Sequence, residues 1–247
     1  MGREWEGHEE VQIDATPEQV WEAIATGPGI DAWFMGRSQV EPGERGAVRT
    51  DMGSFVMEST VTAWNPLKRF AYRSNDAEDG RFIAYEFLIE GREKSSSVLR
   101  LVASGFLPGD DWEAEYDAMM KGGQLYFRTL VAYLTYFPGR MATPVTAFGP
   151  PVADWERAWT VLGGALGLTD SPTVGDPVRF IPDALAPIDG VVDFVNPHAL
   201  GVRTDDALYR FIRGFHGPMV VGHHIFRDVD QQRTGQAWQA WLTRLFV

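Results

Sequence analysis

Residues 10–24, EVQIDATPEQVWEAI, contain the signals that decide the fold. Alternation over residues 10–14 predicts a short β-strand. Thr16 then stands before Pro17, which is the pattern of a helix N-cap followed by proline in the first helical turn. An apolar stripe at helical spacing comes next, made by Val20, Trp21 and Ile24. We therefore expect a strand that leads directly into a short amphipathic helix.

Beyond this helix, the pattern changes to alternating polar and apolar residues separated by turn signals, which is typical of antiparallel strands. Five strands are predicted, over residues 46–51, 54–63, 69–74, 81–90 and 95–103. Alternation places these side chains on the core face: Phe55, Met57, Val61, Phe70, Tyr72, Ile83, Tyr85, Phe87, Ile89, Leu99 and Leu101. Residues 111–137 then have helical spacing and predict one long helix on the sheet, with a bend or close approach at Gly122 and Gly123.

The later part of the chain repeats this order once, in a shorter form. Three segments of the first copy recur in the same order in the second. WEA at 21–23 matches WERA at 155–158, TAWNP at 62–66 matches DFVNP at 193–197, and GQ at 123–124 matches GQ at 235–236. The Trp-to-Asn spacing is 44 residues in the first copy and 41 in the second. Chance recurrence of Asn-Pro and Gly-Gln pairs is the alternative, but order and spacing favour a repeat.

The repeat divides the chain into two expected domains, residues 1–140 and residues 145–247. A Pro- and Gly-containing linker without periodicity is expected around residues 139–144. In the second copy, strands are predicted over residues 208–213 and 219–227, before a final helix that carries Trp238, Trp241, Leu242 and Leu245 on one face. A helix is expected to begin near Pro151.

Residues 10–24 and several matches downstream of them resemble the START-like, or SRPBCC, superfamily. The downstream matches are IDAWF at 30–34, ESTV at 58–61 leading into Asn65-Pro66, and Tyr72-Arg73. More narrowly, residues 8–137 look like bacterial homologues of the C-terminal domain of the heat-shock protein 90 ATPase activator. The resemblance implies an α+β fold of tandem helix-grip (START-like) domains, each a curved antiparallel sheet wrapped around a long C-terminal helix. It also implies a cavity between sheet and helix, which relatives use for lipids, aromatic polyketides or hormones.

Composition narrows the classes of function. The sequence has no cysteine, which excludes disulfides and thiolate metal sites. Its net charge is −12 and it has no run of Lys and Arg, so nucleic acid is not expected as a partner. The longest apolar stretch, residues 158–168, is far shorter than the ~20 residues of a membrane span, and the start MGREWEGHEE is unlike a signal peptide. We expect a cytoplasmic protein with no membrane span.

Motifs that would name a reaction are missing. The sequence contains no G-x-S-x-G, no phosphate-binding loop, no dinucleotide fingerprint and no H-E-x-x-H. We therefore expect no catalytic residue, no cofactor and no metal, and a non-enzymatic role is favoured. His223 and His224 are adjacent in a predicted strand, so one is expected in the interior and the other in solvent. Glu58 and Arg100 are expected on the solvent side as an ion pair.

Seven side chains are expected to converge between the sheet and the long helix: Trp33, Met57, Tyr72, Tyr85, Phe87, Met119 and Tyr126. They form either plain hydrophobic core or an apolar pocket with one or two hydroxyl handles, which is typical of a small-molecule site. Our hypothesis is a non-catalytic protein that binds an apolar or aromatic small molecule there. Two alternatives stay open. One is a co-chaperone-like partner of the heat-shock protein 90 homologue, implied by the resemblance, and the other is an aromatase/cyclase-like enzyme.

Overall fold

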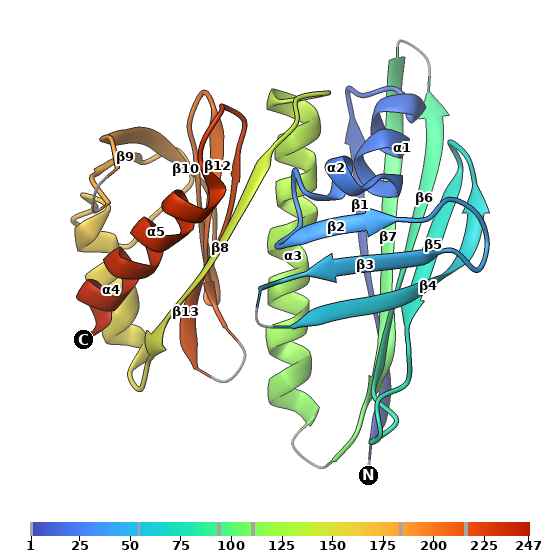
Figure 1. The fold of residues 1–247 in the computed structure, drawn as a ribbon, viewed down its shortest axis with the longest axis horizontal. Helices are drawn as coiled ribbons and strands as arrows, with labels where there is room; N and C mark the ends of the chain where they lie inside the picture. The colour runs from blue at the N-terminus through green and yellow to red at the C-terminus, as the bar shows by residue number, and fades with distance from the viewer. Residues whose placement is uncertain (1, 54, 93–94, 110–111, 183–184, 215–216) are drawn as a thin grey trace. The chain divides into compact units, whose positions relative to one another are not determined.

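The structure is a computed structural model that describes residues 2–53, 55–92, 95–109, 112–182, 185–214 and 217–247. The chain divides into two compact units, one ending at Met141 and the next beginning at Ala142. In each unit a strand comes first, one or two short helices and a run of antiparallel strands follow, and a helix comes last (Figure 1). The chain is therefore an α+β protein of two tandem helix-grip units.

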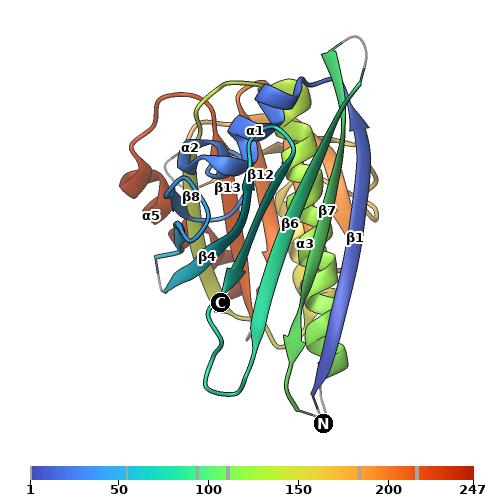
Figure 2. The same cartoon turned by 90° about the vertical axis from the view of Figure 1, so that its right-hand side faces the viewer.

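The first unit contains a seven-stranded sheet in the order β1-β7-β6-β5-β4-β3-β2. Its strands are β1 (Arg3–Ile13), β2 (Arg37–Val40), β3 (Ala47–Asp51), β4 (Val56–Asn65), β5 (Arg69–Ser74), β6 (Phe82–Arg92) and β7 (Ser96–Leu107). Helices α1 (Pro17–Ala25) and α2 (Gly27–Ile30) follow β1, and α3 (Trp112–Tyr136) follows β7. The first strand pairs with the last, and α3 runs along one face of β1 and β7 (Figure 2).

A capping box fixes the start of α1, as the sequence predicts. The Thr16 hydroxyl accepts a hydrogen bond from the backbone N–H of Gln19, and the Gln19 side chain accepts one from the backbone N–H of Thr16, at 3.3 Å and 2.9 Å. Pro17 occupies the first turn, where its missing N–H costs nothing. The helix buries Val20 and Ile24 against the sheet side of the unit.

The second unit has a six-stranded antiparallel sheet in the order β8-β13-β12-β11-β10-β9. Its strands are β8 (Thr143–Pro151), β9 (Pro177–Phe180), β10 (Ile188–Asn196), β11 (Ala199–Arg203), β12 (Ala207–Arg213) and β13 (Pro218–Ile225). Helix α4 (Trp155–Ala165) follows β8, and α5 (Gln231–Phe246) follows β13. The first strand again pairs with the last, and the sheet has one strand fewer than in the first unit.

The two units repeat each other element by element. β8 takes the place of β1, α4 that of α1, and α5 that of α3, while β9 to β13 correspond to β3 to β7. Even a local irregularity recurs, because β4 shifts register at Thr62 and β10 shifts register at Asp193. Each bulge lies three residues before the asparagine that ends the strand, Asn65 or Asn196. The predicted tandem repeat is confirmed by this shared order.

Several strand and helix bounds differ from those expected from the sequence. Residues 143–144 lie in β8 rather than in a linker, because that strand pairs with β13 along its whole length. For the same reason α4 begins at Trp155, since Pro151 ends β8. β1 begins at Arg3, far earlier than predicted, because its polar first half pairs with the end of β7.

Individual side chains also differ from expectation. Phe55 is 54% exposed rather than part of the core, because it precedes β4 instead of lying within it. Glu58 and Arg100 face solvent as predicted, but they do not pair with each other. Glu58 pairs with Arg49 across β3 and β4, and Arg100 pairs with Glu10 across β1 and β7.

Both adjacent histidines are buried, which corrects the expectation that one would face solvent. His223 and His224 are each 0% exposed, because β13 lies between β8 and β12 and is buried on both faces. Gly122 and Gly123 do not mark a close approach either, since a Cβ at either position would meet no described atom within 4 Å. Among the described helices, none is both long and apolar enough to cross a membrane.

Candidate functional site

The expected site residues come from five parts of the first unit. Met57 lies on β4, Tyr72 on β5, Tyr85 and Phe87 on β6, Met119 and Tyr126 on α3, and Trp33 directly after α2. The antiparallel register pairs Tyr72 with Tyr85, and Phe70 with Phe87. Because side chains alternate along a strand, Tyr72, Tyr85 and Phe87 share one face of the sheet.

Four of the seven side chains form a continuous aromatic group. Ring centroids are 5.4 Å apart for Tyr72 and Tyr85, 6.4 Å for Tyr72 and Phe87, and 6.0 Å for Phe87 and Trp33. The Trp33 indole N–H is fixed by a hydrogen bond of 2.9 Å to the carbonyl of Ala23 in α1. The sheet and the first helices together therefore hold this group in place.

The remaining three residues join this group less directly. Tyr126 of α3 contacts Phe34 with centroids 4.6 Å apart, and Phe34 in turn contacts Trp33 at 5.6 Å. The ring contacts do not extend to Met57 and Met119, which are half-buried on β4 and α3. Phe34 is thus a contact residue that the sequence analysis missed, although it directly follows Trp33 in the matched IDAWF segment.

The three tyrosines lie in a desolvated environment. Burial raises the pKa of Tyr72, Tyr85 and Tyr126 far above the usual value of 10. For Tyr72 and Tyr126, negative charge on Tyr85 would raise the pKa further, which places the Tyr85 hydroxyl near both of the others. All three phenols are therefore neutral at physiological pH and can donate or accept hydrogen bonds.

The three phenol hydroxyls can nevertheless still hydrogen-bond to a ligand. Within the described residues, no hydrogen bond joins the hydroxyl of Tyr72, Tyr85 or Tyr126 to another group. Tyr72 is buried, with 5% of its surface exposed, whereas Tyr85 and Tyr126 are only half-buried. Side chains that are desolvated but still partly accessible are typical of the lining of an internal hollow.

Helix α3 provides independent evidence for open space. Its sheet-facing stripe is identified by contacts at three points: Tyr116 with Trp5, Met120 beside Gly7, and Tyr126 with Phe34. Gly123 lies on this stripe, one turn from both Met120 and Tyr126. A Cβ added at Gly123 would meet no described atom within 4 Å, so there is open space beside this glycine, as there is beside Gly235 of the second unit.

The second unit fills the corresponding positions differently. The strand registers and the repeated Gly-Gln pair make Tyr209 equivalent to Tyr85, Phe211 to Phe87, and Trp238 to Tyr126. Tyr209, Phe211 and Trp238 are 2%, 0% and 0% exposed, and the rings of Tyr209 and Trp238 lie 5.7 Å apart. The interior of this unit is packed where tyrosines in the first unit keep accessible surface.

The site offers binding groups rather than an evident reactive centre. The part of the chain that the structure describes has no group of three or more His, Asp or Glu side chains that could hold a metal ion. Among the seven expected site residues, the polar groups are the neutral phenols of Tyr72, Tyr85 and Tyr126 and the Trp33 indole N–H. An antiparallel sheet that packs a C-terminal helix over an aromatic interior defines a helix-grip protein of the START-like class.

Comparison with a protein family specifies this class further. Residues 14–135 match the family described as "Activator of Hsp90 ATPase homolog 1-like protein". The first unit therefore matches this Aha1-like family of the START-like (SRPBCC) superfamily, as the resemblance of residues 8–137 predicted. No curated protein matches the chain.

Solved structures with a similar fold include both single-unit and longer proteins. A protein of Mesorhizobium loti is 24% identical over 53% of this chain and 96% of its own, with a TM-score of 0.47. The di-domain ARO/CYC BexL from the BE-7585A biosynthetic pathway is 11% identical over 90% of this chain and 85% of its own, with a TM-score of 0.47. DynU16, from the dynemicin biosynthetic locus, is 18% identical over 98% and 95%, with a TM-score of 0.46.

Proposed function

We propose that the first unit binds an apolar or aromatic small molecule between its sheet and α3, and that it does so without catalysing a reaction. The observation that carries this proposal is the open space beside Gly123, on the same face of α3 as Tyr126. Around it, three phenol hydroxyls lack protein partners within the described residues. A ligand would fill the space and satisfy the hydroxyls.

The chemistry of the lining favours a neutral ligand with an apolar body. Trp33 and Phe87 offer aromatic walls, and burying apolar ligand surface contributes roughly 25 cal/mol per Å². Met57 and Met119 are flexible and can adapt to ligands of different shape. Neutral phenols can hydrogen-bond a carbonyl or hydroxyl of the ligand, but they cannot neutralise a charge in a desolvated interior.

The same tyrosines argue for binding without catalysis. A general acid or base works best when its pKa lies near the working pH. Burial moves the pKa of Tyr85 and Tyr126 away from neutrality rather than toward it. We therefore assign these side chains to ligand recognition and not to proton transfer.

The test combines ligand discovery with a change of cavity volume. Native mass spectrometry of the full chain purified from its own host should reveal a bound apolar molecule, which denaturation would release for identification. In parallel, the neutral fluorophore 1-aminoanthracene should bind and raise the melting temperature. Gly123→Trp should abolish both effects by filling the space, whereas Gly123→Ala, which adds one carbon, should preserve them.

Two outcomes would reject this proposal. One is a clean apo mass together with no binding of 1-aminoanthracene by the wild-type chain. The other is unchanged binding in a folded Gly123→Trp variant, because a ligand in this hollow could not coexist with an indole there. Gly235→Trp, at the equivalent position of α5, serves as the matched control and should leave binding to the first unit unchanged.

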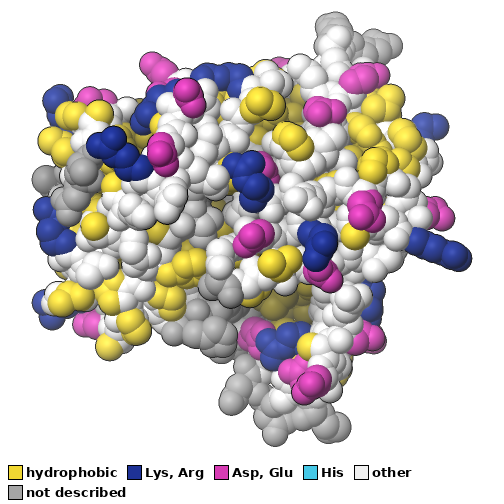
Figure 3. Space-filling model, in the orientation of Figure 1, with side chains coloured by type: hydrophobic (Ala, Val, Ile, Leu, Met, Phe, Trp, Pro, Cys, Tyr) yellow, Lys and Arg dark blue, Asp and Glu magenta, His cyan; other side chains and the backbone are white. Residues whose placement is uncertain are grey.

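The family match favours a second candidate function, a co-chaperone-like interaction with a heat-shock protein 90 homologue. The chain carries a net charge of −12, which would steer it toward a basic partner surface. On the face seen in Figure 3, acidic and basic side chains are interspersed, so charge is not concentrated there. Measuring the chaperone's ATPase rate with and without the full chain tests this candidate, and an unchanged rate together with no salt-sensitive co-purification would reject it.

A further inference from the structure

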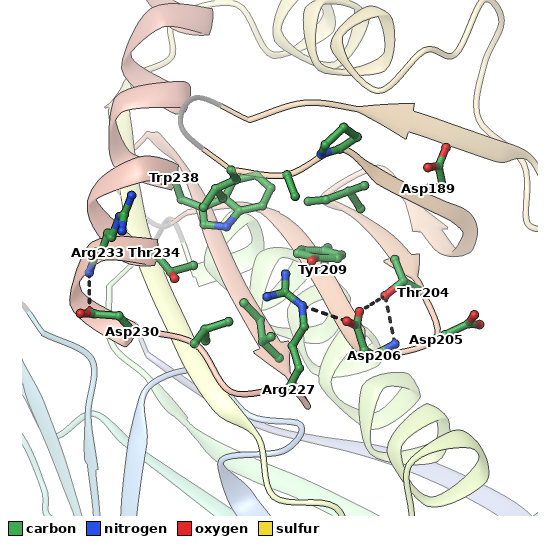
Figure 4. Close-up of a pocket in the computed structure, with 16 residues that line it drawn as sticks. Asp189, Thr204, Asp205, Asp206, Tyr209, Arg227, Asp230, Arg233, Thr234 and Trp238 are labelled. Carbon is green, nitrogen blue, oxygen red and sulfur yellow. Dashed lines mark hydrogen bonds and ion pairs between the residues drawn. The ribbon is translucent and has the colours of Figure 1, made fainter.

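The second unit contains a hollow of its own, separate from its packed interior. It has a volume of about 630 Å³ and opens to solvent (Figure 4). Its lining comes from the start of α5, the turn between β11 and β12, the end of β13, and the segment that leads into β10. Because Tyr209 and Trp238 are packed together beneath it, the hollow lies at the mouth of the unit rather than inside it.

The floor of this hollow contains an unused hydrogen-bond donor. Trp238 lines the hollow, and its indole Nε1–H is buried with no hydrogen-bond partner among the described residues. In Figure 4 the indole nitrogen lies on the edge of the ring that is turned toward Tyr209 and Arg227. A buried donor without an acceptor is costly, and an acceptor supplied by a ligand would remove that cost. The apolar walls beside it are formed by Leu185, Pro187, Ile188, Ile225 and Val229.

The rim of the hollow is held in position and is mainly acidic. Asp206 pairs with Arg227 at 2.8 Å and accepts a hydrogen bond from the Thr204 hydroxyl at 2.9 Å. The Arg227 guanidinium also lies beside the Tyr209 hydroxyl. The lining contains four carboxylates but only two guanidinium groups, so an anion would meet net repulsion. The four carboxylates belong to Asp189, Asp205, Asp206 and Asp230.

We propose that the second unit binds a small, neutral or cationic aromatic molecule with a hydrogen-bond acceptor at this mouth. The aromatic body lies between the apolar walls of the hollow, above the packed rings of Tyr209 and Trp238, and the acceptor takes the Trp238 indole N–H. The acidic rim selects against anionic molecules of the same shape. This site does not rest on the function proposed for the first unit, because it uses different residues in a separate unit.

Three probes of similar size test the three parts of this proposal by nuclear magnetic resonance of the full chain. Coumarin is neutral and has a carbonyl acceptor, naphthalene lacks the acceptor, and coumarin-3-carboxylate adds a negative charge. The expected result is a saturable shift of the Trp238 indole N–H resonance with coumarin. Naphthalene should bind about tenfold more weakly because it leaves the indole unpaired. Coumarin-3-carboxylate should also bind about tenfold more weakly because of the rim.

Resonance assignment of the wild-type chain identifies Trp238, so the readout does not depend on a core variant that fails to fold. Asp189→Asn with Asp205→Asn should restore binding of coumarin-3-carboxylate and leave coumarin unchanged. Glu156→Gln, an exposed acidic position on α4 outside the lining, is the matched control and should change neither.

Each negative outcome overturns a defined part of the proposal. An unshifted Trp238 resonance at saturating coumarin rejects the site, and equal affinity for naphthalene rejects the role of the indole N–H. Equal affinity for coumarin-3-carboxylate rejects the selectivity of the rim. A shift of the Trp33 resonance without a shift of Trp238 would leave the proposal for the first unit standing and reject this one.

Discussion

Thr62 of β4 and Asp193 of β10 occupy the same position in the two units, because each is the extra residue of a bulge near the end of its strand. Their chemistry differs. The Asp193 carboxylate accepts two hydrogen bonds from the Arg210 guanidinium, both 2.9 Å long, and the Arg210 side chain is 1% exposed. In the first unit, the residue equivalent to Arg210 is Glu86, which pairs with Arg69 nearer the surface.

Removing Asp193 should destabilise the second unit strongly. Asp193→Ala leaves the Arg210 guanidinium buried without its counter-charge, which typically costs 3–5 kcal/mol, so we expect a loss of about 4 kcal/mol in the free energy of unfolding. Guanidinium chloride unfolding of the full chain measures this loss. Glu86→Ala is the matched control and should cost about 1 kcal/mol or less, because its pair with Arg69 is partly exposed. Equal losses in the two variants would contradict the prediction.

Asp31 should make the stability of the first unit depend on pH. Burial raises the pKa of Asp31 from 3.8 to about 6, although the Ser38 backbone N–H, at 2.6 Å, and the Arg37 guanidinium act in the opposite direction. Because the folded pKa exceeds the unfolded one, the folded state holds the proton more tightly. The contribution of Asp31 is therefore complete below about pH 4 and is lost as the pH rises through 6.

Asp31→Asn should remove this dependence, since an amide does not ionise. The difference in melting temperature between Asp31→Asn and wild type should grow in favour of the variant from pH 4 to pH 7. Glu58→Gln, at an exposed pair, serves as the control and should show no such trend. Parallel curves for Asp31→Asn and wild type would refute the assignment.

The equivalent tyrosines Tyr85 and Tyr209 should respond differently to loss of the hydroxyl. Tyr85→Phe removes a hydroxyl without a protein partner, so stability should change by less than about 0.5 kcal/mol. Tyr209→Phe removes a hydroxyl beside Arg227 and should cost about 1 kcal/mol. Affinity for an acceptor-bearing ligand of the first unit should fall only in Tyr85→Phe. Urea unfolding and fluorescence titration of the two variants measure both quantities, and the reverse pattern would exclude our assignment of the Tyr85 hydroxyl to ligand recognition.

His223 should remain neutral well below the pH at which a free imidazole titrates. Burial lowers its pKa, and the nearby His224 and Arg210 lower it further. The backbone N–H of Arg210 donates to Nδ1 of His223 at 3.0 Å, which fixes the tautomer protonated at Nε2. Nitrogen-detected resonance spectra between pH 5 and 8 should therefore show one neutral Nε2–H tautomer throughout. Protonation of His223 above pH 6 would disprove this description.

Most of the fold could be predicted from the sequence, because its signals are local. Alternation marks five strands of the first unit, helical spacing marks α3, and the Asn-Pro echo marks the repeat. Strands β2, β8, β9, β10 and β11 were not predicted, and for two of them the missing local signal is plain. β2 is only four residues long. β8 contains three prolines and a glycine, which is a composition typical of a linker, and only its pairing with β13 identifies it as a strand.

The candidate site could be predicted only in part, for a physical reason. Strand alternation correctly puts Tyr72, Tyr85 and Phe87 on one face, since no bulge interrupts the pairing of β5 with β6. Alternation cannot show whether that face is packed or hollow. Tyr85 and Tyr209 have the same position and the same side chain, and they differ in exposure because Tyr126 in one unit is replaced by Trp238 in the other.

The pairing of first and last strands in each unit has a consequence for synthesis on the ribosome. β1 is made first, but its partner β7 is complete only at Leu107, so the backbone of β1 emerges long before it can join a sheet. A strand that waits with an unpaired edge invites aggregation, and charged residues along it reduce that hazard. The sequence Arg3–Ile13, REWEGHEEVQI, carries five charged residues between its few apolar ones, which suits a strand that must stay soluble until its partner arrives.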